Sequence, residues 1–107
     1  MIITLIIRCE PEQSHPMKRT LAFIESALQQ GHSIRQCFFQ GAGVRAALAD
    51  SLLPRWIKIA ETGETELVLC SQSVEEFQVT VHAPFVIGGL GALIEASVHA
   101  DRVMSCV

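Results

Sequence analysis

Five short apolar segments divide the chain, and each has the length and composition of a β-strand. The expected strands are residues 2–8, 33–39, 64–70, 84–87 and 102–107. The first, Ile2-Ile-Thr-Leu-Ile-Ile-Arg8, is apolar at nearly every position rather than at every second one. This pattern is typical of a strand covered on both faces, as in a parallel sheet.

The segments between these strands carry apolar residues at helical spacing. The first helix is expected from Ser14, a capping residue, with Pro16 in its first turn and Gly31 as its C-terminal stop. Its apolar face consists of Met17, Leu21, Ile24 and Leu28. That face is expected to pack on the sheet.

Two further helical segments are expected between residues 41 and 63, separated by Pro54. The first carries Val44, Ala47 and Leu48 on one side, and the second carries Trp56, Ile59 and Ala60 and ends at Gly63. Ser73 and Glu76 then have the spacing of a capping box, which predicts a brief helix before an extended segment over residues 78–82.

The last helix is expected to open at residues 88–91, Gly-Gly-Leu-Gly. Its buried side is expected to hold Leu90, Leu93, Ile94 and Val98. Strands joined by helical crossovers predict right-handed βαβ units. The fold class is therefore α/β, a three-layer α/β/α sandwich with a five-stranded, mainly parallel sheet, and residues 1–107 are expected to form a single domain.

Composition narrows the classes of partner. Half of the residues are hydrophobic and 18% are charged, so the chain can bury a core and still leave apolar surface for a partner subunit; we expect a homo-oligomer. The net charge of −3 and the scattered cations argue against nucleic acid. The apolar N-terminus has no basic residue before it and no cleavage site after it, so a strand is expected there and not a secretory signal. No apolar run is long enough to span a membrane. Four cysteines without a secretory signal favour the cytoplasm.

Cys70 is the main candidate for chemistry, because it ends a strand just before a helix start. Ligands and reactive groups collect at the carboxyl ends of strands in open α/β sheets, and a thiolate there can act as a nucleophile. Glu75 and Glu76 would disfavour a thiolate if they faced it. A buried cysteine that only packs is the alternative interpretation.

Other candidates are weaker. Cys9, also at a strand end, is the second-choice thiol and could lie near Cys70 across the sheet; His82 could assist proton transfer if its loop folded over Cys70. Gly41-x-Gly43 after a strand suggests a nucleotide-binding turn or merely tight packing. The four cysteines and four histidines lack the close spacing of zinc ligands, so no metal or cofactor is expected.

Several motifs resemble the DsrE/TusD family of sulfur-relay proteins over essentially the whole chain. The most specific is residues 85–97, with Gly-Leu-Gly-Ala-Leu-x-Glu-Ala, followed by Ala-Asp-Arg-Val at 100–103. The other matches are Gly31-His32, Phe38-Phe39 with Gly43-Val44, and Leu67 to Cys70. Between Cys70 and Gly88 the chain is shorter than is typical of that family, and Ser71 to Glu76 replaces an Ala-rich, basic stretch.

The resemblance implies a function for Cys70. It is expected to accept sulfane sulfur as a persulfide and to pass it to the thiol of a partner protein, as a sulfurtransferase or carrier without a cofactor. The resemblance also implies a homotrimer or homohexamer and sulfur-carrier proteins as donor and acceptor. The alternative is a non-catalytic assembly subunit of a DsrE-type complex, in which Cys70 is a packing residue.

Overall fold

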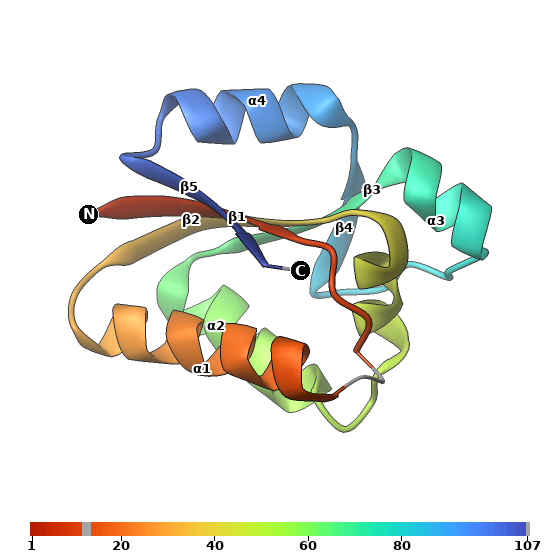
Figure 1. Cartoon of the computed structure of the whole chain (residues 1–107), viewed down its shortest axis with the longest axis horizontal. Helices are drawn as coiled ribbons and strands as arrows, with labels where there is room; N and C mark the ends of the chain where they lie inside the picture. The colour runs from red at the N-terminus through yellow and green to blue at the C-terminus, as the bar shows by residue number, and fades with distance from the viewer. Residues whose placement is uncertain (12–13, 107) are drawn as a thin grey trace.

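A five-stranded sheet runs through the middle of the protein, here a computed structural model that describes residues 1–11 and 14–106 (Figure 1). Its strands are β1 (Ile2–Ile7), β2 (Ser33–Phe39), β3 (Glu66–Cys70), β4 (Phe85–Gly88) and β5 (Arg102–Cys106). Each neighbouring pair is parallel, in the order β4-β3-β2-β1-β5. The expected parallel sheet is confirmed, while the expected end of its last strand at residue 107 lies outside the described residues.

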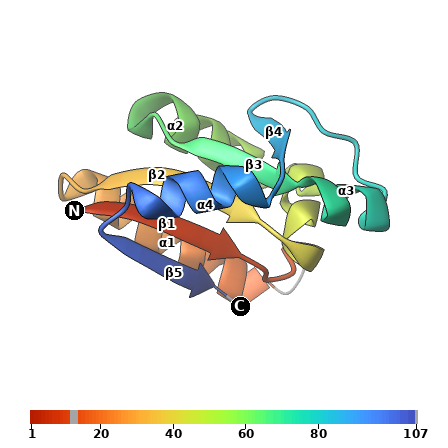
Figure 2. The same ribbon diagram turned by 90° about the horizontal axis from the view of Figure 1, so that it is seen from above.

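Helices cover both faces of the sheet and confirm the three-layer α/β/α arrangement. They are α1 (Ser14–Gln29), the 3₁₀ helix η1 (Gly41–Leu48), α2 (Leu53–Gly63), α3 (Ser71–Phe77) and α4 (Leu90–Val98). Figures 1 and 2 show α1 and α2 together on one face and α4 on the other. The short helices η1 and α3 lie against each other beyond the carboxyl ends of β2 and β3. Pro54 stands in the first turn of α2, where its missing N–H leaves no helical bond unmade.

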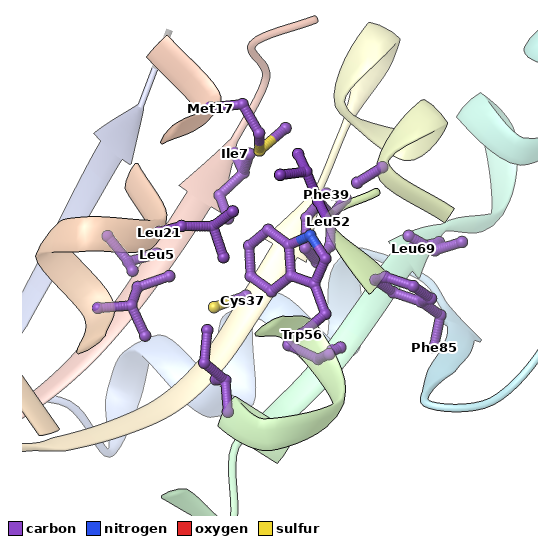
Figure 3. Close-up of a cluster of buried hydrophobic side chains, with 14 of the residues drawn as sticks. Leu5, Ile7, Met17, Leu21, Cys37, Phe39, Leu52, Trp56, Leu69 and Phe85 are labelled. Carbon is purple, nitrogen blue, oxygen red and sulfur yellow. The ribbon is translucent and has the colours of Figure 1, made fainter. Parts of the chain in front are cut away.

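The main core lies between the sheet and the pair α1 and α2 (Figure 3). Trp56 of α2 is fully buried and meets the ring of Phe39 edge to face, with 5.1 Å between ring centroids. Phe39 in turn meets Phe85 at 5.6 Å. Met17, Leu21 and Ile24 of α1 are also fully buried, as their spacing predicts. This core joins α1, α2 and the four strands β1 to β4 into one unit.

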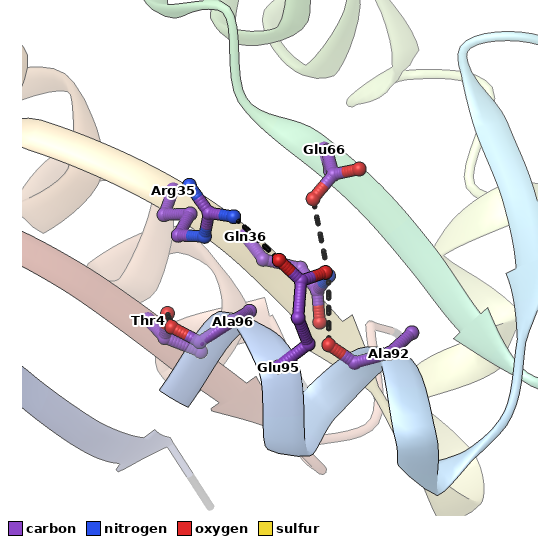
Figure 4. Close-up of polar contacts among 7 residues, drawn as sticks. All are labelled: Thr4, Arg35, Gln36, Glu66, Ala92, Glu95 and Ala96. Atoms are coloured by element: carbon purple, nitrogen blue, oxygen red, sulfur yellow. Dashed lines mark hydrogen bonds and ion pairs between the residues drawn. The ribbon is translucent and has the colours of Figure 1, made fainter. Parts of the chain in front are cut away.

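Polar contacts hold α4 to the opposite face of the sheet (Figure 4). The buried hydroxyl of Thr4 in β1 donates to the carbonyl oxygen of Ala96 at 3.1 Å. The Nε2 of Gln36 in β2 donates to the carbonyl oxygen of Ala92 at 3.4 Å and to a carboxylate oxygen of Glu66 at 3.3 Å. Arg35 and Glu95 form an ion pair at 2.9 Å beside the helix. The face of the sheet under α4 therefore carries hydrogen-bonding side chains. The opposite face, under α1 and α2, presents apolar side chains instead.

The prediction of which side of α4 is buried was wrong for three of its four residues. Leu90, Ile94 and Val98 are 56%, 62% and 73% exposed, whereas Leu93 is half-buried and Ala96 is buried. The helix is apolar almost all round, so its periodicity does not select a side. The hydrogen bonds from the sheet to the carbonyls of α4 select the side with the small residues.

Smaller corrections concern element ends. β3 begins at Glu66 rather than at residue 64, because Glu64 takes the left-handed conformation (φ 51°) that ends α2. Leu48, expected on the buried side of its helix, is exposed. The helix after Cys70 begins at Ser71, two residues earlier than the capping box suggested. Residues 78–82 form a loop rather than an extended segment.

Candidate functional site

Cys70 stands at the carboxyl edge of the sheet. It is the last residue of β3 and occupies the N-cap position of α3, where its backbone is extended (φ −60°, ψ 123°) and its side chain makes no capping hydrogen bond. In the register of β3 and β4 it lies opposite Gly88. A Cβ on Gly88 would come within 2.6 Å of a methyl carbon of Val68, so the space beside these residues requires glycine there.

The side chain of Cys70 lies on the α4 side of the sheet. Side chains alternate along a strand, so Leu67 and Leu69 enter the main core while Val68 and Cys70 face the other way. There Cys70 packs in a small apolar cluster with Phe38, Val68 and the half-buried Leu93 of α4. Only 6% of the residue is exposed. Glu75 and Glu76, considered from the sequence as charges that could face the thiol, are exposed to solvent.

A tight turn at the end of β2 leads into η1, and glycines in this turn bring η1 close to β1 and to α3, the helix that follows Cys70. The backbone N–H of Gly41 donates to the hydroxyl of the buried Ser73 at 2.9 Å, and this bond ties η1 to α3. Gly41 has φ +57°, and a Cβ on Gly43 would lie 2.2 Å from the carbonyl oxygen of Ile7. Both glycines thus serve the close approach of η1 to β1 and α3, which supports the packing interpretation of this turn. Ser73 bonds to Gly41 instead of closing a capping box.

Arg45 brings a positive charge to the same turn, and its charge is paired. Its guanidinium lies 3.1 Å from a carboxylate oxygen of Glu10 and sits over the ring of Phe77 at 5.0 Å from the centroid. The sequence marked Phe38 only as part of a family motif and Leu93 only as a buried residue of the last helix, and it did not single out Arg45. Their place around the thiol edge depends on contacts between distant parts of the chain, which no local motif marks.

The other thiols lie elsewhere. Cys9 is buried near Thr20 in the core on the α1 and α2 side, where burial raises the pKa of its thiol despite a hydrogen bond with Thr20. The hypothesis that Cys9 lies near Cys70 was wrong, since β2 separates their strands and the two thiols belong to clusters on opposite faces. Burial also raises the pKa of the fully buried Cys37 far above its usual range. Cys106 is half-buried.

His82 does not fold over Cys70. Its ring nitrogens lie 3.0 Å from the carbonyl oxygens of Ala47 and Ala83, and its ring faces the edge of Phe85 in the main core. Over residues 1–11 and 14–106, no three side chains of His, Cys, Asp and Glu lie together as a metal site would require. None of the described helices combines the length and the apolar character needed to cross a bilayer.

Known proteins resemble this chain along nearly its whole length. A protein of Allochromatium vinosum named sulfurtransferase DsrE is 29% identical, and the match covers 97% of each chain. A sulfurtransferase TusD homolog of Pseudomonas aeruginosa is also 29% identical, over 89% of each chain. The crystal structure of the ychN protein from E. coli has the same fold, with a TM-score of 0.81 and 17% identity over 98% of each chain.

The family model gives the same result from the sequence. The model of the DsrE/DsrF-like family matches residues 1–106, nearly the entire chain. This match confirms the resemblance drawn from the Gly-Leu-Gly-Ala-Leu-x-Glu-Ala run and the strand that ends on Cys70. The chain belongs to the DsrE/DsrF-like family.

Proposed function

We propose that residues 1–107, as a single domain, act as a sulfur carrier in which Cys70 accepts sulfane sulfur as a persulfide and passes it to a partner protein. One observation carries the proposal: the thiol lies at the carboxyl end of a central strand. That edge is where open α/β sheets place their reactive groups. The two curated relatives named as sulfurtransferases support the same class of function.

The chemistry consists of two thiol exchange steps that balance without a redox partner. In the first, the Cys70 thiolate attacks the outer sulfur of a donor persulfide; the new S–S bond forms as the donor's S–S bond breaks, and the donor leaves as a thiolate. In the second, an acceptor thiolate attacks the outer sulfur on Cys70, and Cys70 leaves as a thiolate. Neither step needs a metal or an organic cofactor.

The surroundings of Cys70 suit a carried persulfide but restrict access to it. Phe38, Val68 and Leu93 form apolar walls, which keep competing water and thiols from the sulfur. A donor can reach a residue that is 6% exposed only after a neighbouring side chain moves. Leu93 is the neighbour contributed by α4, whose carbonyl oxygens at Ala92 and Ala96 accept hydrogen bonds from Gln36 and Thr4 of the sheet. We therefore infer that loading requires a displacement of Leu93.

The same burial favours the alternative, a non-catalytic assembly subunit in which Cys70 only packs. Buried structural cysteines are usually inert, and the exposed apolar side chains of α4 would suit a complex. The two functions differ in one measurable respect, which is whether the thiol can gain a sulfur atom.

The partners form part of the proposal. Sulfur-carrier proteins with exposed thiols are proposed as donor and acceptor, and the chain itself is proposed to work as a homo-oligomer in the cytoplasm. The four described cysteines are all free thiols, as a reducing compartment would keep them.

The loading experiment tests the proposal. Purified, reduced protein is treated with polysulfide, excess reagent is removed, and the intact mass is measured. We expect the chain to gain one sulfur atom and to lose it again when a small acceptor thiol is added. A chain that gains no sulfur, under conditions in which the thiols remain reduced, would reject the carrier and leave the assembly subunit.

A further inference from the structure

A groove of about 400 Å³ lies between α1 and β5, the edge strand of the sheet, on the face opposite α4. Met104 faces this groove, because its partner in β1, Leu5, belongs to the main core on the same side. Arg102 faces it for the same reason, opposite the buried Ile3. The groove is open to solvent, since Met104 is 39% exposed and Phe23 of α1 is 38% exposed.

The groove is polar at one end and apolar along the rest. Arg102 is the first residue of β5 and His32 stands just before β2, so both lie at the amino edge of the sheet, on either side of β1. The remaining lining is mainly apolar and includes Ile3, Phe23, Ala27 and Met104. A ligand that fills the groove therefore meets hydrogen-bond donors at one end and hydrocarbon at the other.

The polar end is cationic, and its donors are available. Within residues 1–11 and 14–106, Arg102 forms no ion pair, and its guanidinium donates only to the carbonyl oxygen of Asp101 at 3.3 Å. The carboxylate of Asp101 accepts the backbone N–H of Ile2 at 2.8 Å instead. The amino nitrogen of Met1 lies 3.3 Å from Nδ1 of His32, so Nδ1 accepts and the other ring nitrogen, Nε2, carries a proton. No Asp or Glu is among the described residues that line the groove, although the chain has a net charge of −3.

We propose that this groove binds a small amphipathic carboxylate, with the carboxylate between Arg102 and His32 and an alkyl chain between Phe23 and Met104. Guanidinium and imidazole N–H groups are the donors that a carboxylate accepts best. The unbranched side chain of methionine adapts to a flexible alkyl chain. Small-molecule sites usually measure about 300–1,000 Å³ and combine an apolar lining with a few polar groups, as this groove does.

The charges of the groove select this ligand over others. A cationic amphiphile would meet Arg102 without a carboxylate to pair with. A neutral apolar surface, including that of a second copy of the chain, would cover the guanidinium and leave it unpaired, which opposes binding. A carboxylate pairs with the guanidinium at the open end of the groove, where water still reaches both groups.

This inference goes beyond the sulfur carrier and does not depend on it. The groove lies at the amino edge of the sheet on the α1 side, whereas Cys70 lies at the carboxyl edge on the α4 side. Binding is measured without any persulfide, and Cys70→Ser should bind the ligand as wild type does. The failure of either proposal can therefore be told apart from the failure of the other.

Isothermal titration calorimetry tests the inference with hexanoate, octanoate and decanoate. Each buried methylene strengthens binding about fourfold, so octanoate is expected to bind up to about 15-fold more tightly than hexanoate. Octylamine has the same chain with the opposite charge and should bind at least about tenfold more weakly than octanoate.

Two substitutions in the same strand locate the site. Met104→Glu places a carboxylate in the apolar part of the groove and is expected to abolish octanoate binding. Val103→Glu is the matched control: Val103 is also exposed, but it lies on the α4 side, since its partner Thr4 donates to Ala96 of α4. This variant should bind octanoate as wild type does.

Arg102→Gln tests the cationic end. Loss of one charge-assisted hydrogen bond at a partly exposed site is expected to weaken octanoate binding about two- to tenfold. Far-UV circular dichroism and thermal unfolding verify that each variant folds, and Arg102→Glu replaces Met104→Glu if that variant does not.

Four results would overturn the inference. These are no octanoate binding by wild type, as when another copy of the chain covers the groove; equal binding of octylamine; no gain with chain length; and an equal loss in Val103→Glu.

Discussion

Cys70→Ser is expected to abolish sulfur loading from polysulfide and therefore transfer to an acceptor thiol. A serine hydroxyl cannot form a persulfide, and the side chain is otherwise close in size to cysteine. The variant is compared with wild type by intact mass, and the expected result is a fall to the background of untreated protein. Cys70→Ala accompanies it, because a hydroxyl among Phe38, Val68 and Leu93 costs about 1–3 kcal/mol if it finds no hydrogen bond, and alanine avoids that cost.

Two other cysteines provide the controls for this prediction. Cys106→Ser removes the half-buried thiol of β5 and should leave loading intact. Cys9→Ser removes the second-choice thiol, which lies on the other face of the sheet, and should also leave it intact. A Cys70 variant that still gains sulfur, together with loss of loading in either control, would assign the carrier role to another thiol.

Trp56→Ala is expected to lower the free energy of unfolding by about 3–5 kcal/mol, the usual range for removing a large buried aromatic ring. The indole fills the centre of the main core, edge to face with Phe39 and 6.4 Å from Phe85. Alanine leaves a cavity between α2 and the sheet, which α2 could close only by shifting toward the sheet and disturbing the surrounding core. Urea unfolding followed by circular dichroism measures the loss, since Trp56 is the only tryptophan and its fluorescence disappears with it.

Trp56→Phe is the matched control. It keeps an aromatic ring against Phe39, and it loses no observed hydrogen bond, because the indole Nε1 has no partner among the described residues. We expect a markedly smaller loss than for alanine. A loss below about 1 kcal/mol for Trp56→Ala would be typical of a surface position and would contradict the core described above.

Much of the fold follows from local pattern. The five strands, the amphipathic α1 and the break at Pro54 are written in short stretches of sequence, and the structure reproduces each within a few residues. The order of the strands and the pairing of Cys70 with Gly88 depend on contacts between distant segments, which no local pattern contains.

The candidate site shows the same division. The place of Cys70 at a strand end could be predicted, because it needs only the end of one apolar run. The surroundings could not: Cys9 lies on the other face, and His82 is turned toward Ala47. The orientation of α4 was predicted wrongly because its buried side is chosen by Thr4 and Gln36, residues that its own sequence does not reveal.

Peptide mapping of the loaded protein tests the central claim most directly. Trypsin cleaves after Lys and Arg, so the sequence places each of the four cysteines on its own peptide, with Cys70 on residues 59–102. Protein loaded with polysulfide is alkylated, digested and analysed by mass spectrometry. The account predicts one added sulfur atom on the 59–102 peptide. Added sulfur confined to the peptides of the other cysteines, or found on no peptide, would contradict it.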